Sequence, residues 1–229
     1  MIAVIDYGMG NLRSVAKALE SAGANEVRVS SDAGIIRGAD KIVLPGVGAI
    51  KEAMRELKRL NLIEVIQENI FKKPFLGICL GLQLLFERSE EGGRVRGLGV
   101  FKGTVRRFPD RLKVPHMGWN QINIKYQISP AKAGSRLLLN DEREKTKNTN
   151  QKPKISNLFL KNIPDGSYFY FCHSYYAAPQ DKNIIAATTD YGLEFASAIR
   201  KDNLFACQFH PEKSQSLGLK LLKNFVELK

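Results

Sequence analysis

The sequence predicts an α/β fold with a mostly parallel central sheet, helices on both faces and a more strand-rich C-terminal half. In the first half of the chain, short apolar runs alternate with amphipathic segments of helical periodicity, as in strands joined by crossover helices. From about Val95 onward the pattern changes to strands separated by hairpin signals. The chain has 229 residues, of which 44% are apolar, so it is long enough for one domain with its own core.

The elements of the first half follow from apolar runs and the turn residues between them. An apolar run opens the chain as a strand, and Gly23 ends the helix that follows it. Pro45-Gly46 stops a third strand, and a short buried strand after Pro74 leads directly into Cys79. In chain order we expect a strand at 2–6, a helix at 11–22, strands at 26–29 and 41–44, a helix at 49–71, a strand at 74–78 and a helix at 80–88.

The second half is expected to hold mainly strands and a final helix. The predicted strands cover residues 97–108, 168–176, 184–189, 195–200 and 204–209, and the helix covers 217–228. Residues 145–154 (KTKNTNQKPK) almost lack apolar side chains, so we expect a basic insertion or long loop at about 125–156. No repeat or linker divides the chain, and the predicted organisation is a single domain over residues 1–229.

The charge of the chain is basic but unevenly distributed. The 35 Lys and Arg residues against 23 Asp and Glu residues give a formal net charge of +12. Such a surplus suggests nucleic acid as a partner, because clustered basic side chains release counterions from phosphate backbones. However, residues 125–161 carry nine basic and three acidic residues, which is half of the surplus. The sequence also lacks an aromatic RNA-binding pattern and a helix-turn-helix signal, so we expect no nucleic-acid partner.

The cysteines and the N-terminus indicate a cytoplasmic protein. Cys79, Cys172 and Cys207 have no CxxC spacing and predict neither a disulfide framework nor a zinc site. The N-terminus has no basic segment or cleavage site of a secretory signal, and no stretch reaches the ~18–20 apolar residues of a membrane helix. Cys172 and Cys207 lie in strand-like runs, and we expect them to be buried packing residues.

Cys79 lies in a pattern typical of a catalytic nucleophile. Residues 77–81 (GICLG) match the G-x-nucleophile-x-G elbow, in which a sharp strand-to-helix turn leaves no room for side chains beside the nucleophile. The turn places the thiol at a helix N-terminus, where the thiolate is favoured and the backbone N–H of Leu80 can stabilise an oxyanion. A lone cysteine is more often a small buried hydrophobe, but the flanking glycines favour the nucleophile.

His210 is the best candidate for the base that a thiol nucleophile needs. Among the histidines His116, His173 and His210, only His210 ends a predicted strand and is followed two residues later by a carboxylate, Glu212. In an extended segment, residues two positions apart point to the same side, so both side chains would lie together. A carboxylate there fixes the tautomer of the imidazole and stabilises the imidazolium. The sequence therefore predicts a Cys79–His210–Glu212 triad.

This order of triad residues resembles the class I glutamine amidotransferase family. Papain-like enzymes use an Asn to orient the His, and caspase-like enzymes place the His before the Cys. The resemblance spans nearly the whole chain outside about 125–156, and six segments make it look like the glutaminase subunits of imidazole glycerol phosphate synthase. These segments are 6–11 (DYGMGN), 45–48 (PGVG), 77–83 (GICLGLQ), 115–120 (PHMGWN), 173–175 (HSY) and 208–214 (QFHPEKS).

The resemblance implies a flavodoxin-like fold and a glutaminase that passes ammonia to a separate cyclase subunit, a (β/α)8 barrel, in a heterodimer that makes imidazole glycerol phosphate and AICAR. It implies that Cys79 attacks the γ-carboxamide of L-glutamine, that His210 moves the proton and that Glu212 orients His210. No cofactor is implied, and the scattered histidines indicate no metal site.

The resemblance also carries expectations for substrate, oxyanion and partner contacts. The substrate contacts are expected from Gln83, Ser174 and Tyr175, and the second oxyanion donor from the Val47 or Gly48 amide. Because this loop reorients in the family when the partner binds, we expect the isolated chain to be a poor glutaminase. The expected contacts with the cyclase are Asn11, Met117, Trp119, Asn120 and Lys213.

Three alternatives remain open at this point. A paralogous glutaminase that feeds the amidation of a surface-polysaccharide sugar would share the same chemistry, and the predicted insertion leaves the identity of the partner open. A basic, non-catalytic nucleic-acid-binding module is a remote alternative. A degenerate domain with a purely structural role is disfavoured, because all three triad residues are present.

Overall fold

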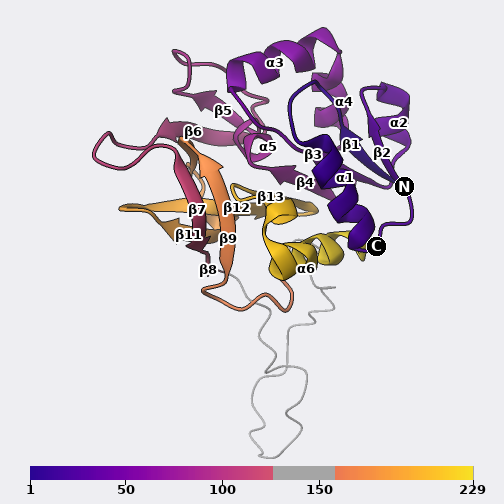
Figure 1. Ribbon diagram of the computed structural model, residues 1–229. Coiled ribbons are helices and arrows are strands. Elements are labelled where there is room, and N and C mark those ends of the chain that lie inside the picture. Colours follow the sequence, from indigo (N-terminus) through magenta and orange to yellow (C-terminus); the bar gives the residue numbers. More distant parts are fainter. Residues whose placement is uncertain (126–157, 229) are drawn as a thin grey trace, which may run out of the picture.

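The computed structural model describes residues 1–125 and 158–228, so the predicted insertion lies outside the described residues apart from Lys125. Two sheets run through the described part of the chain (Figure 1). The larger one contains β1 (Ile2–Ile5), β2 (Val27–Ser30), β3 (Lys41–Leu44), β4 (Phe75–Ile78), β5 (Phe86–Ser89), β6 (Phe101–Arg107), β8 (Asn123–Ile124), β10 (Tyr175–Pro179), β11 (Ile185–Asp190), β12 (Glu194–Lys201) and β13 (Leu204–Cys207). The smaller one pairs β7 (His116–Gln121) with β9 (Tyr168–His173).

The strands β2, β1, β3, β4 and β13 pair in that order and are all parallel. Successive residues of β1 and β3 point to opposite faces, and both faces are buried, which explains why these strands are continuous apolar runs. The helices α1 (Leu12–Ser21) and α6 (Gln215–Val226) lie side by side and share one core with them. The helices α2 (Ala33–Gly38), α3 (Ile50–Arg59) and α4 (Leu62–Asn69) pack in the other core.

The second half of the sheet is mainly antiparallel. β12 pairs antiparallel with β13, β11 and β10, and β10 continues antiparallel to β6. The β7–β9 sheet packs against this half through a buried aromatic cluster, in which Phe171 of β9 contacts Phe195 and Phe209. The α/β class and the strand-rich C-terminal half are therefore confirmed.

Most predicted elements differ from the observed ones by a few residues at their ends, and three differ more. The helix at 49–71 is two helices, α3 and α4, because Asn61 adopts a left-handed conformation with φ 55° between them. The helix at 80–88 ends early as α5 (Leu80–Gln83), because Phe86–Ser89 pairs with β6 instead. The strand at 168–176 divides at Ser174 into β9 and β10, which belong to different sheets.

The sequence did not predict α2, β7 or β8, which are short and carry weak periodicity. None of the helices in the described ranges is long and apolar enough to cross a membrane.

Candidate active site

The turn after β4 has the geometry of a nucleophile elbow. Cys79 has φ 53° and ψ −105°, which is a strained conformation for a residue with a side chain. A Cβ atom on Gly81 would lie 1.9 Å from the carbonyl oxygen of Leu44, and one on Gly77 would lie 2.9 Å from Cβ of Ala206. Only glycine fits at both positions, which is the steric reason for the GICLG pattern.

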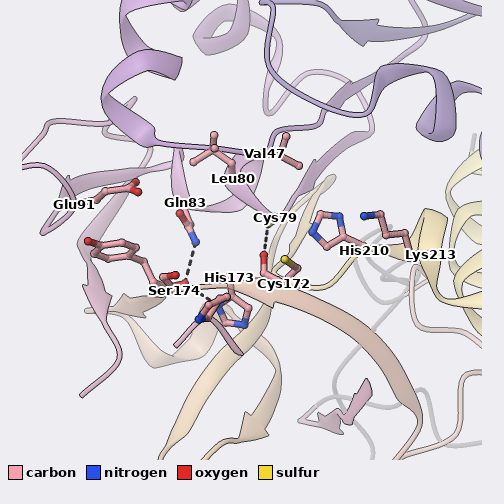
Figure 2. Close-up of a pocket in the computed structure, with 13 residues that line it drawn as sticks. Val47, Cys79, Leu80, Gln83, Glu91, Cys172, His173, Ser174, His210 and Lys213 are labelled. Carbon is pink, nitrogen blue, oxygen red and sulfur yellow. Dashed lines mark hydrogen bonds between the residues drawn. The ribbon is translucent and has the colours of Figure 1, made fainter. Parts of the chain in front are cut away.

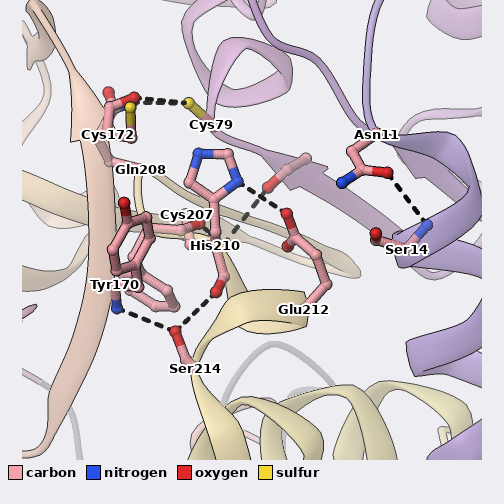
Figure 3. A network of polar contacts seen from close by, with 12 residues as sticks. Asn11, Ser14, Cys79, Tyr170, Cys172, Cys207, Gln208, His210, Glu212 and Ser214 are labelled. Carbon is pink, nitrogen blue, oxygen red and sulfur yellow. Dashed lines mark hydrogen bonds and ion pairs between the residues drawn. The ribbon is translucent and has the colours of Figure 1, made fainter. Parts of the chain in front are cut away.

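The register of the two central parallel strands brings the second half of the chain to this turn. Ile78, the last residue of β4, is paired with Cys207, the last residue of β13, and the N–H of Cys79 donates to the carbonyl of Cys207 at 2.7 Å. The residues that follow these strands therefore meet at the carboxyl edge of the sheet. Cys79 follows one strand, and Gln208 and His210 follow the other (Figure 3).

His210 and Glu212 form a buried pair. Nδ1 of His210 lies 2.8 Å from Oε1 of Glu212, and both side chains are 3% exposed. Their spacing does not arise from an extended segment, as the sequence suggested. Residues Pro211–Lys213 form a 3₁₀ turn, η4, which carries Glu212 back beside the imidazole. Ser214 fixes this turn, because its hydroxyl donates to the carbonyl of His210 at 2.6 Å.

The charge state of His210 depends on its two neighbours. Burial alone would lower the pKa of the imidazole, but the charge of Cys79 and the hydrogen bonds to Cys79 and Glu212 raise this pKa to about 10. The imidazolium is therefore the stable form at neutral pH, beside the sulfur of Cys79. Burial, followed by the charge of Cys79, raises the pKa of nearby Tyr7, so that its phenol stays neutral.

A cavity of 240 Å³ opens beside Cys79 (Figure 2). Most of the predicted site residues line it, namely Val47, Gly48, Cys79, Leu80, Gln83, Ser174, Tyr175, His210 and Lys213. Four further residues line it that the sequence did not predict as site residues, namely Glu91, Pro115, Cys172 and His173. The expectation for Cys172 was wrong, since it is half-buried in the cavity wall at the end of β9, whereas Cys207 is fully buried.

One of the predicted oxyanion donors, the N–H of Leu80, is engaged within the protein. The N–H of Leu80 donates to the carbonyl of Gly46 at 3.3 Å, so it is already occupied. The preceding carbonyl, that of Pro45, accepts the hydroxyl of buried Tyr7 at 2.7 Å. Beyond these anchored residues, Val47 is 44% exposed and Gly48 has φ +95°, a conformation that only glycine adopts easily.

Gln83 and Gln208 form a chain of hydrogen bonds to the thiol. Nε2 of Gln83 donates to the carbonyl of Tyr175 at 2.9 Å and to Oε1 of Gln208 at 3.1 Å. Nε2 of Gln208 in turn donates to Sγ of Cys79 at 3.6 Å. Gln208 is 0% exposed. No sequence pattern singled out Gln208 on its own, although it begins the QFHPEKS segment.

His116 and His173 form a second buried pair next to the cavity. Nδ1 of His116 lies 3.0 Å from Nε2 of His173, and Nδ1 of His173 lies 2.8 Å from the carbonyl of Tyr175. Asn120 lies 3.2 Å from Nε2 of His116 through its Nδ2 atom. Burial lowers the pKa of His116 to about 4 and that of His173 to about 3, so both rings are neutral at pH 7.

These two lowered pKa values predict acid destabilisation. Below pH 6.5 the unfolded chain binds protons that the folded chain does not, so the free energy of unfolding falls from pH 6.5 to about 4 through His116 and to about 3 through His173. His210 adds nothing in this window, because its raised pKa is linked to stability only above 6.5. We expect a loss of about 2–4 kcal/mol between pH 7 and pH 4.5 in chemical denaturation. His116→Gln should lose part of this dependence, and equal slopes in both proteins would contradict the assignment.

Of the residues predicted to face a partner, Lys213 lines the cavity, whereas the other four do not. Met117 and Trp119 on β7 are 60% and 47% exposed, and Asn11 and Lys213 are also exposed. Trp119 packs edge-on against Tyr170, and Nζ of Lys213 lies 5.7 Å from the centre of the same ring. Asn120 is half-buried, and its amide donates to the carbonyl of Asp190. Within the described residues, no group of three His, Cys, Asp or Glu side chains could hold a metal ion.

Comparison with known proteins places this geometry in a family context. The family model for glutamine amidotransferase class-I matches residues 3–228. The imidazole glycerol phosphate synthase subunit HisH of Acinetobacter baylyi is 50% identical over 99% of this chain and 97% of its own length, and the subunit of Aquifex aeolicus is 49% identical over 97% and 94%. A crystal structure of a glutamine amidotransferase aligns with a TM-score of 0.68 at 13% identity, over 100% of this chain and 98% of the other.

Proposed function

Because the chain belongs to the class I glutamine amidotransferase family, we propose that it acts as the glutaminase subunit of imidazole glycerol phosphate synthase. It hydrolyses glutamine to glutamate and ammonia, in the service of histidine biosynthesis. The observation that carries this proposal is the meeting of an elbow cysteine with a buried His210–Glu212 pair at the wall of one cavity. Relatives that carry this name match the chain over almost its whole length.

The proposed reaction follows from the charges at the site. The thiolate of Cys79 attacks the γ-carboxamide carbon of glutamine, and the proton held by His210 goes to the departing nitrogen as ammonia forms. This leaves a γ-glutamyl thioester on Cys79. Neutral His210 then takes a proton from water, which attacks the thioester and releases glutamate. Glu212 keeps Nδ1 of His210 engaged, so that Nε2 is the atom that exchanges protons with the thiol.

We propose that Gln83, Ser174, Tyr175 and Glu91 bind the substrate. Glu91 is the acidic residue among the described residues that line the cavity, and its Oε2 accepts the N–H of Ile50 at 2.9 Å, which fixes the carboxylate at the start of α3. A fixed carboxylate suits the α-ammonium group of glutamine. Lys213 at the other side of the cavity provides the opposite charge.

The proposed partner is a cyclase subunit with a (β/α)8 barrel, bound as a heterodimer to the exposed face around Asn11, Met117, Trp119, Asn120 and Lys213. The exposed side chains of Met117 and Trp119 support this choice, because large apolar residues are typical of interface centres. We further propose a cytoplasmic location, which agrees with three free cysteines, and a single domain over residues 1–229 with an insertion at about 125–156.

The bond from Leu80 to Gly46 supports partner-dependent activation. Both the Leu80 N–H and a Val47 or Gly48 amide must face the substrate to form the oxyanion hole, so the 45–48 loop has to turn first. We expect the isolated chain to hydrolyse glutamine about 10²–10³-fold more slowly than its complex with the cyclase and the cyclase ligand. Equal rates would contradict the gating.

Co-purification with the candidate cyclase, followed by a glutaminase assay with and without the nucleotide ligand of the cyclase, tests the function itself. Stable association and ligand-stimulated glutamate release support the proposal. Association instead with a partner that amidates a sugar, together with glutaminase activity only in that complex, would replace it with the paralogous function.

A further inference from the structure

Two side chains that follow β13 approach Cys79. Gln208 and His210 both follow β13, at the edge of the sheet where Cys79 follows β4 (Figure 3). The proposed mechanism uses His210 and leaves Gln208 without a role. Yet Gln208 is a fully buried amide whose Nε2 lies 3.6 Å from the reacting sulfur.

The orientation of this amide follows from its neighbours. A backbone carbonyl can only accept, so the end of Gln83 that lies 2.9 Å from the carbonyl of Tyr175 must be its NH₂ group. The same NH₂ group lies 3.1 Å from Gln208, which must therefore present its oxygen there. The NH₂ group of Gln208 is consequently turned toward Sγ of Cys79. The carbonyl of Tyr175 thus sets the orientation of the Gln83 amide, which sets that of the Gln208 amide. As a result, a hydrogen-bond donor faces the sulfur of Cys79.

A second chain strengthens the anchor. The carbonyl of Tyr175 also accepts Nδ1–H of His173, whose Nε2 faces Nδ1 of His116. Both histidines are buried. The carbonyl of Tyr175 therefore accepts two hydrogen bonds, one from Gln83 and one from His173. It is consequently held from two sides, and Gln83 has little freedom to turn its amide over.

We propose that Gln208 is a further residue of the reaction, which donates a hydrogen bond to the Cys79 thiolate, and that Gln83 positions it for this task. This inference rests on the proposed glutaminase function. A hydrogen bond from a neutral amide to a charged sulfur is stronger than one to a neutral thiol, so the donor favours the anion. His210 supplies the opposite charge, and Gln208 holds the sulfur in place after His210 has given its proton to the leaving nitrogen.

Other groups around the sulfur of Cys79 also affect the balance between its thiol and its thiolate. They are the same in the wild type and in the Gln208 variant, so they do not account for a difference between the two profiles. His210 favours the thiolate, whereas neutral Tyr7 and the fully buried thiol of Cys207 lie near it without a stabilising charge. The carbonyl of Cys172 lies 3.9 Å from Sγ. His173 and Lys213 line the same cavity, and Glu212 acts through His210.

Alkylation of Cys79 by iodoacetamide tests the proposal without relying on glutamine. Peptide-resolved mass spectrometry separates Cys79 from Cys172 and Cys207, and the rate is measured from pH 5 to pH 10. We expect Gln208→Met to move the midpoint of the Cys79 profile upward by about one pH unit, with a rate about tenfold lower at pH values below both midpoints and an unchanged limit at high pH. Gln67→Met is the matched control, since Gln67 donates to the carbonyl of Leu98 at a distant surface and should leave the profile unchanged.

A double-variant cycle tests the role of Gln83. If Gln83 acts only through Gln208, Gln83→Met should shift the profile in the same direction, and the double variant should equal Gln208→Met alone. Additive shifts would overturn the positioning role of Gln83. A lower melting temperature with an unmoved profile would show that Gln208 is merely structural and would overturn the proposal. If the wild-type complex showed no glutaminase activity, the proposed function would be refuted. The alkylation profile would still decide whether Gln208 donates to the sulfur of Cys79.

Discussion

Replacement of Cys79 by alanine is expected to abolish glutamine-dependent synthesis by the complex, with a loss of at least about 10⁴-fold in glutaminase kcat. The thiolate forms the covalent intermediate, and no other thiol lies in the elbow between β4 and α5. Ammonia-dependent synthesis should persist, because it bypasses glutamine. Both activities are measured in the same complex, one with glutamine and one with an ammonium salt.

The matched control is Cys172→Ala. This thiol lines the same cavity on the facing strand β9, so its loss changes the cavity wall but not the nucleophile. It should retain glutamine-dependent synthesis within severalfold. If Cys79→Ala kept glutamine-dependent activity, the assignment of the nucleophile would be wrong.

Glu212→Gln should have the second largest effect, a fall of about 10³–10⁴-fold in glutaminase kcat with little change in KM. The carboxylate accepts from Nδ1 of His210 and raises the pKa of the imidazole through its hydrogen bond and charge, alongside the larger effect of Cys79. An amide can donate to Nδ1 instead, which favours the tautomer with its proton on Nε2. That tautomer cannot accept the proton of the thiol.

Glu227→Gln provides a control for the change of charge. Glu227 is exposed near the end of α6 and forms an ion pair with Lys223 at 3.8 Å. It should keep full activity, because an exposed pair contributes only about 0–1 kcal/mol to stability. A fall of less than tenfold for Glu212→Gln in the complex would contradict the proposed role of the carboxylate.

The local part of the site could be predicted from sequence, because local rules determine it. The elbow could be predicted from two glycines, Gly77 and Gly81. In the structure, a side chain at either position would collide with Ala206 or Leu44. The family resemblance is confirmed by the family model and by relatives of about 50% identity. The strand at 41–44 has the predicted bounds, since turn residues limit it at its end.

The parts that could not be predicted depend on pairing between distant segments. Gln208 lies 129 positions from Cys79 along the chain, and only the register of β13 against β4 brings its amide to the sulfur. Glu91 reaches the cavity because the helix ends at Gln83 and the following residues form the strand β5. The helical periodicity of the sequence does not reveal this change from helix to strand.

The position of β13 between β4 and β12 has a consequence for the order of synthesis. The elbow and its thiol leave the ribosome when more than half of the chain is still to be made, and at about 5–20 residues per second the segment with Gln208 and His210 follows roughly 6–26 seconds later. A growing or truncated chain therefore exposes a cysteine without its base and with the centre of the sheet unfilled. Release of ammonia cannot begin until the last strand has entered the sheet.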